Sequence, residues 1–168
     1  VHKAHSKQIS RAASLLLRAQ RPIIYTGGGV VLSGAAKQLT TLVERLGHPC
    51  TNTLMGLGAL ASDHPKFLGM LGMHGTYEAN MAMYECDVML AVGARFDDRV
   101  TGDLKKFSPN AKIIHIDIDP ASIGKNVSVE VPIVGDAGAA LEQLLEALGE
   151  TSVEQDTESL AQWWGRLT

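Results

Sequence analysis

The feature that most constrains the fold is the alternation of short apolar runs with longer segments of helical periodicity. Residues 22–26, 88–92 and 129–134 are short apolar runs that fit buried strands, whereas residues 34–46 repeat apolar side chains at helical spacing. Strands that alternate with helices of this length form βαβ units, and nearly continuous apolar strands fit a parallel sheet covered on both faces. The sequence therefore predicts an α/β fold, a doubly wound Rossmann-like sheet of about six parallel strands with helices on both faces.

The remaining segments extend this pattern and set the expected domain boundary. Further strands are expected at 49–53, 67–70 and 112–119, and further helices at 6–19, at 76–86, after Asp136 and at 157–167. Residues 150–156 are polar and are typical of a linker. We expect residues 1–149 to form one nucleotide-binding domain, and residues 150–168 to form a linker and short helix toward a third domain that the chain lacks.

Composition excludes several classes of function. The 168 residues carry a formal charge of −3 with no basic block, and only 5% are aromatic, so no nucleic-acid partner is expected. No apolar run approaches the ~20 residues of a membrane span, so no membrane partner is expected either. Cys50, Cys86 and the six histidines show no metal-ligand spacing, which predicts no metal site. We interpret both cysteines as reduced core residues of a cytoplasmic protein, and the initial Val1 as the start of a piece of a longer polypeptide.

Glycine-rich segments follow the predicted strands. They lie at 27–29, 53–58, 71–75 and 93–102, and the polar segment 117–120 follows the next strand. Ligands bind outside the carboxyl ends of parallel strands, and glycine lets a backbone approach a phosphate closely. Because Leu32 replaces the third glycine of GxGxxG, the first segment alone fits a tight turn equally well. Together, the five segments predict a long groove for an extended ligand that contains phosphate and adenosine.

Two arginines in the fourth segment are the candidate anion ligands. The guanidinium groups of Arg95 and Arg99 can each bind phosphate oxygens in a fork, although ion pairs with Asp97 and Asp98 are the alternative.

Three further side chains are candidates for contacts with the rest of the ligand. Asp117 can accept hydrogen bonds from ribose hydroxyls, and His74 can stack on a ring. Asp136 is first a predicted helix N-cap and only second a ligand contact.

The same segments form one ordered series of motifs. They read Gly-Gly-Gly at 27–29, Thr-Leu-Met-Gly-Leu-Gly at 53–58, Leu-Gly-Met-Leu-Gly-Met-His-Gly at 68–75, Gly-Ala-Arg-Phe-Asp-Asp-Arg-Val-Thr-Gly at 93–102 and Ile-His-Ile-Asp-Ile-Asp-Pro at 114–120. Over roughly residues 6–149, this series closely resembles the central domain of the catalytic subunit of the acetohydroxyacid synthases (acetolactate synthases), a family of thiamine-diphosphate enzymes.

The resemblance implies a six-stranded central domain that holds FAD in an extended pose. The full enzyme of that family condenses two pyruvates, or pyruvate and 2-oxobutyrate, with release of CO2 in branched-chain amino-acid (isoleucine and valine) biosynthesis, and its flavin does no net redox work. No catalytic residue and no metal ligand are implied for this chain. The implied FAD-binding residues are Gly27, Gly28, Gly29, Thr53, Leu54, Met55, Leu71, Gly72, Met73, His74, Gly93, Ala94, Arg95, Asp97, Arg99, Val100, Asp117, Ile118, Asp136 and Ala137.

The resemblance also implies parts that lie outside this chain. In the family, thiamine diphosphate and Mg2+ are held by a glutamate of a first domain and a Gly-Asp-Gly…Asn-Asn motif of a third. This chain offers only Gly135-Asp136-Ala137, so the fragment alone is expected to be inactive. The implied partners are those two missing domains, further copies in a homodimer or tetramer, and a possible regulatory small subunit.

Two alternatives remain open. One is a bracing central domain of another thiamine-diphosphate enzyme, whose groove is vacant or holds ADP. An NAD-dependent deacylase-like fold shares the general architecture, but this chain lacks its paired zinc cysteines.

Overall fold

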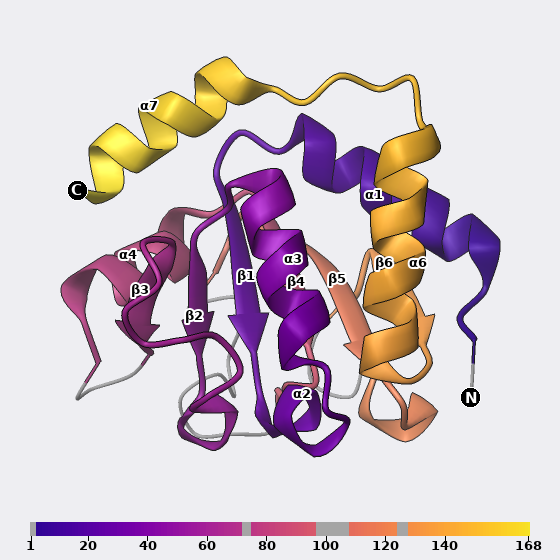
Figure 1. Ribbon diagram of the computed structural model, residues 1–168. Helices are drawn as coiled ribbons and strands as arrows, with labels where there is room; N and C mark the ends of the chain where they lie inside the picture. The colour runs from indigo at the N-terminus through magenta and orange to yellow at the C-terminus, as the bar shows by residue number, and fades with distance from the viewer. Residues whose placement is uncertain (1–2, 72–74, 97–107, 124–127) are drawn as a thin grey trace.

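Six strands form one sheet in the computed structural model, which describes residues 3–71, 75–96, 108–123 and 128–168. The strand order is β3-β2-β1-β4-β5-β6, and every neighbouring pair is parallel (Figure 1). The predicted parallel α/β fold is confirmed. The strands are β1 (Pro22–Thr26), β2 (Cys50–Asn52), β3 (Phe67–Met70), β4 (Val88–Val92), β5 (Lys112–Asp117) and β6 (Val131–Val134).

The helices agree with the apolar spacing of the sequence, with one addition. They are α1 (Ser6–Arg18), α2 (Gly28–Leu32), α3 (Ala36–Leu46), α4 (Tyr77–Glu85), α6 (Ala137–Glu150) and α7 (Thr157–Leu167), with the single 3-10 turns η1 (Leu54–Gly56) and η2 (Pro120–Ser122). The addition is α2, because the glycine segment at 27–29, for which the sequence predicts a turn and no helix, opens a short helix. There, Val30 N–H donates to the Gly27 carbonyl and Ser33 N–H to the Gly29 carbonyl.

The sheet has a hydrophobic core on each face. Ile24, Leu90 and Ile114 pack with α1, α3 and α6, whereas Tyr25 and Met89 pack with α4 and α7. Successive side chains of a strand point to opposite faces, so a strand covered on both sides needs apolar residues at every position. This explains the unbroken apolar runs in the sequence.

The direction of winding reverses between β1 and β4. The chain moves outward from β1 to β2 and β3, and then returns to β4, which pairs with β1 in the register Thr26↔Val92. Because all six strands are parallel, the segments that follow them lie at one edge of the sheet. A reversal of this kind is where ligands bind in open α/β sheets.

The C-terminal helix α7 packs on the opposite edge, beside the first residues of the strands (Figure 1). The Trp163 side chain is only 2% exposed, and its Nε1–H donates to the Pro22 carbonyl at 2.8 Å. Trp164 Nε1–H donates to the Gly47 carbonyl at 2.8 Å. The predicted linker therefore leads into a helix that packs on this domain. That the chain continues from this helix into a third domain stays a prediction.

Within the described ranges, no helix is both long and apolar enough to cross a membrane.

Candidate functional site

Backbone contacts between glycines join the ends of β1 and β4. Gly27 N–H donates to the Val92 carbonyl and Gly29 N–H to the Gly93 carbonyl, each at 3.0 Å. A Cβ atom on Gly29 would lie 2.7 Å from the Gly93 Cα, so no side chain fits there. Gly93 itself adopts a φ of +60°, the left-handed region that favours glycine. These glycines therefore interlock two loops, and the N–H groups of Gly27 and Gly29 are used in doing so.

The segment after β2 is fixed against the end of β1 in the same way. Thr53 N–H donates to the Thr26 carbonyl at 2.9 Å, and a Cβ atom on Gly56 would lie 2.8 Å from that carbonyl oxygen. The Met55 side chain is 75% exposed and lies beside Gly28. Segments that are far apart in sequence thus form one continuous edge.

A cavity of about 430 Å³ opens at this edge, where β1, β4, β5 and β6 end. Its walls come from α2, from the loop after β4, from the end of β5 and from the start of α6. The lining residues are Gly29, Leu32, Ser33, Gly93, Arg95, Ile116, Asp117, Ile118, Asp119, Asp136 and Ala137.

Among the described residues, those with charged groups that line the cavity supply three carboxylates and one guanidinium group. Asp117 Oδ1 accepts from Asp119 N–H at 2.9 Å, and Asp136 Oδ2 accepts from Ala139 N–H at 3.0 Å. The second bond confirms Asp136 as the N-cap of α6. Arg95 is exposed and is the only basic one of the described residues that line this cavity. Carboxylates accept from hydroxyl groups and guanidinium binds phosphate, so the cavity suits a ligand that carries both.

A buried histidine lies beneath the loop that carries Arg95. His115 Nε2 is 2.9 Å from the Ala94 carbonyl oxygen and 3.8 Å from Asp117 Oδ2. Burial lowers the pKa of His115, although the Ala94 carbonyl and Asp117 act in the opposite direction. The imidazole is therefore neutral near pH 7 and donates from Nε2, because a carbonyl can only accept.

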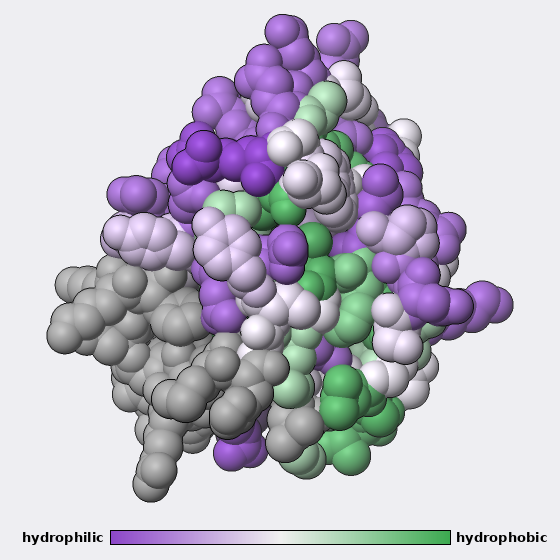
Figure 2. Space-filling view, turned by 90° about the vertical axis from the view of Figure 1, so that its left-hand side faces the viewer, coloured by the Kyte–Doolittle hydropathy of each residue, from purple (hydrophilic) through white to green (hydrophobic). Residues whose placement is uncertain are grey.

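Exposed apolar side chains surround the cavity. Leu32 is 90% exposed and Ile118 is 62% exposed, and both line it. Met55 and Leu57 are also exposed and follow β2. Figure 2 shows hydrophobic surface low on the molecule, at the end where the strands of Figure 1 finish. Exposed apolar surface of this kind marks a place for a ligand or another part of a protein.

The cavity brings together seven of the residues predicted from the sequence: Gly29, Gly93, Arg95, Asp117, Ile118, Asp136 and Ala137. Seven others lie at the same edge but do not line it: Gly27, Gly28, Thr53, Leu54, Met55, Leu71 and Ala94. The last six, namely Gly72, Met73, His74, Asp97, Arg99 and Val100, fall outside the described residues.

The sequence reasoning missed four lining residues: Leu32, Ser33, Ile116 and Asp119. Leu32 was noted only as a break in GxGxxG, and its place on a short helix had no periodic signal. Asp119 stands in the motif at 114–120, so its position after a strand was a usable signal.

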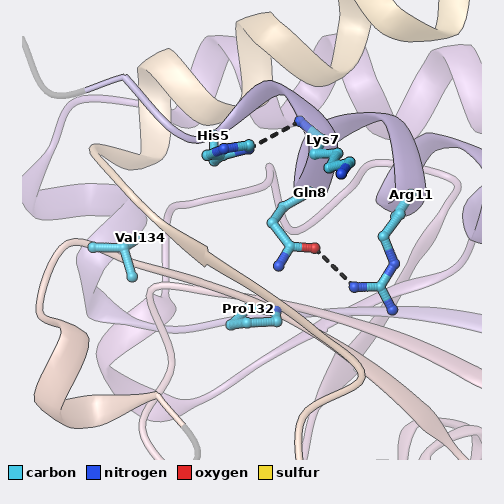
Figure 3. Close-up of a pocket in the computed structure, with 6 residues that line it drawn as sticks. All are labelled: His5, Lys7, Gln8, Arg11, Pro132 and Val134. Carbon is cyan, nitrogen blue, oxygen red and sulfur yellow. Dashed lines mark hydrogen bonds between the residues drawn. The ribbon is translucent and has the colours of Figure 1, made fainter.

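A second cavity of about 380 Å³ lies between the start of α1 and β6 (Figure 3). Its basic side chains are His5, Lys7 and Arg11, and Arg11 also donates to Gln8 Oε1 at 2.9 Å. Arg11 pairs with Glu130 at 3.5 Å as well. In the part of the chain that the structure describes, no residue lines both cavities.

The first cavity fits the nucleoside part of a nucleotide. Its volume lies in the lower part of the ~300–1,000 Å³ range of small-molecule pockets. The carboxylates of Asp117 and Asp136 suit ribose hydroxyls, and the exposed side chains of Leu32 and Ile118 offer apolar walls for a base. Fold and site together define a parallel α/β domain with a small-molecule-sized cavity at its topological switch point.

Comparison with known proteins agrees with this class. Residues 9–144 match the family described as "Thiamine pyrophosphate enzyme, central domain", and the chain belongs to this family. It is similar to acetolactate synthase large subunits. The identity is 51% to isozyme 3 of Escherichia coli (strain K12), over 97% of this chain and 28% of that protein. It is 52% to the protein of Haemophilus influenzae, over 97% and 28%. It is 57% to a probable large subunit of Methanocaldococcus jannaschii, over 86% and 24%. The chain thus spans about a quarter of the length of these relatives.

Proposed function

We propose that this chain is the FAD-holding central domain of a thiamine-diphosphate-dependent acetolactate synthase, a carboligase that condenses two pyruvates, or pyruvate and 2-oxobutyrate, with release of CO2 in branched-chain amino-acid biosynthesis. The observation that carries the proposal is the cavity at the switch point. It combines carboxylates that can accept from ribose hydroxyls, a guanidinium group and apolar walls in a chain about half identical to acetolactate synthase large subunits. The chain alone is proposed to be inactive.

Each group of cavity residues is assigned to one part of the FAD molecule. Asp117 and Asp136 would accept from the ribose of the adenosine half, Arg95 would bind the diphosphate, and Ile118 would contact the adenine. The flavin half would extend over the exposed apolar side chain of Met55, toward the ends of β2 and β3. When bound, FAD would supply a flat conjugated ring that, in the acetolactate synthases, does no net redox work.

The remaining components belong to the rest of the polypeptide and to other subunits. Thiamine diphosphate and Mg2+ would be held by a first and a third domain, in a homodimer or tetramer with a possible regulatory small subunit. Cys50 and Cys86 are both free and buried, which supports the proposed cytoplasmic location.

The test is FAD titration of the full-length protein, followed by flavin fluorescence. R95A is expected to raise the Kd for FAD at least tenfold, because a charge-assisted contact to phosphate is lost. R18A, an exposed arginine in the last turn of α1, is the matched control and should leave the Kd unchanged. A wild-type protein that binds thiamine diphosphate but no FAD would contradict the proposal.

A second candidate is a bracing domain that holds ADP or nothing. The observation in its favour is that the cavity is sized for a nucleoside, while the N–H groups of Gly27 and Gly29 are already bonded to backbone. Competition between ADP and FAD separates the two functions. The bracing function predicts that ADP binds at least as tightly as FAD, whereas the FAD-holding function predicts that FAD binds much more tightly.

A further inference from the structure

The loop after β4 is fixed at two points beneath the cavity. His115 Nε2–H donates to the Ala94 carbonyl at 2.9 Å, and the imidazole meets the Phe96 ring edge to face at a centroid distance of 5.0 Å. Phe96 in turn lies 6.2 Å from the Tyr25 ring of β1. Arg95 stands between the two fixed residues, is exposed, and lines the cavity. The direction of Arg95 is therefore set by what holds Ala94 and Phe96.

Burial of His115 leaves one ring nitrogen without a hydrogen bond, which costs folding free energy that hydrophobic packing alone would not require. Its side chain is fully buried in β5, and its Nδ1 atom is buried without a hydrogen-bond partner. An apolar residue at this position would fill the core without an unsatisfied nitrogen, which ordinarily destabilises a fold. What the imidazole adds is one donor aimed at the Ala94 carbonyl.

Asp117 does not take that proton. Its Oδ2 atom lies 3.8 Å from His115 Nε2, beyond hydrogen-bond distance, and its Oδ1 accepts from Asp119 N–H. His115 thus binds the loop, and the Oδ2 atom of Asp117 is not engaged by it.

We propose that His115 is a positioning residue, which holds the loop 94–96 so that Arg95 faces the phosphates of the bound nucleotide. The inference rests on the proposed function of the cavity. It predicts that His115 acts through Arg95 and touches no ligand itself.

The test measures the Kd for FAD and for ADP with the full-length protein. H115L is expected to raise the Kd at least fivefold, and H115Q to stay within about twofold of wild type, because the glutamine amide reaches the Ala94 carbonyl as Nε2 does. The double variant H115L/R95A should bind no more weakly than R95A alone, since His115 acts through that arginine. H48L is the matched control, because His48 is 1% exposed, also has an unpartnered Nδ1 and precedes β2 at the other end of the sheet.

The outcomes separate the two proposals. Unchanged affinity in H115L, or a loss in the double variant equal to the product of the single losses, overturns the role of His115 alone. A wild-type protein that binds neither nucleotide overturns the proposed function and this inference with it. If H115L does not fold, H115N replaces it, because the asparagine amide falls short of the Ala94 carbonyl. Equal affinities of H115N and H115Q would then overturn the inference.

Discussion

Gly27 and Gly93 pack backbone against backbone at the point where the sheet reverses its winding. A Cβ atom on Gly27 would lie 2.4 Å from the Gly93 carbonyl oxygen and 2.6 Å from the Ala94 Cα. Neither neighbour is a flexible side chain, so a larger residue at position 27 must displace a loop. The ends of β1 and β4, beside the cavity, can therefore approach this closely only because position 27 has no side chain.

The G27A substitution is therefore expected to destabilise the chain by about 3 kcal/mol, at the upper end of the usual cost of overpacking. Urea unfolding of the purified chain checks this value. The matched control is G28A in the same segment, where the nearest atom to a new Cβ is the Met55 Cβ at 3.2 Å. Its effect should stay below about 1 kcal/mol. Equal losses in the two variants would show that the interlock of β1 and β4 is not the cause.

Trp163 anchors α7 to the rest of the domain through burial and a hydrogen bond, so its removal should lower the free energy of unfolding. W163A is expected to lower the free energy of unfolding by about 3–5 kcal/mol, because a fully buried indole is lost and the Pro22 carbonyl loses its donor. W164A is the control, since the Trp164 side chain is only half buried and should cost clearly less. The Kd for FAD of the full-length protein should not respond to either change, because both residues lie at the edge away from the cavity. A changed Kd in W163A would contradict this separation.

Periodicity was enough to predict the strands, since every residue of β1 and β4 is buried and apolar runs mark such strands directly. The contact of Gly27 with Gly93 joins positions 66 residues apart, and no local pattern indicates which loops interlock. Trp163 lies in the segment 150–168, which the polar residues 150–156 predict to be a linker and short helix outside this domain. The burial of Trp163 depends on packing against the first residues of strands that lie far away in the sequence, such as Pro22 and Ile23 of β1.

The candidate site shows the same division. Asp136 could be predicted as an N-cap, because a cap is a local arrangement of one side chain and the next turn. Leu32 could not be placed in the cavity, because its position depends on how α2 packs beside η1, α3 and α6. His115 belongs to the motif at 114–120, but its hydrogen bond to Ala94 spans 21 residues and has no local sequence signal.

The two roles of Asp136 can be separated by substitution. D136A should cost about 1 kcal/mol of stability, because the N-cap of α6 is lost. D136N should keep the cap, since the amide oxygen still accepts from Ala139 N–H. Both variants should bind FAD more weakly than wild type, because neither presents a second oxygen to a ribose hydroxyl. Wild-type affinity in D136N would remove Asp136 from the ligand site. Urea unfolding and FAD titration together give both quantities.

Buried histidines predict that the chain loses stability as the pH falls below about 6.5. Burial lowers the pKa of His48 to about 3 from an ordinary value of 6.5. The unfolded chain therefore binds a proton at a higher pH than the folded chain does, and acid favours unfolding between these two values. Each pH unit in this window costs about 1.4 kcal/mol for a histidine that stays neutral when folded.

Between pH 7.5 and 5.0, the free energy of unfolding of the wild-type chain should thus fall by about 2 kcal/mol more than that of H48Q, which has no titrating group at position 48. S10A is the control, because Ser10 is exposed and carries no titrating group, and it should follow the wild-type dependence. Burial also lowers the pKa of His115, so the free energy of unfolding of H48Q should still fall over this pH range, but by less than that of the wild type. Urea unfolding at the two pH values measures the difference. Parallel pH dependences of H48Q and wild type would show that His48 accepts its proton without unfolding the chain.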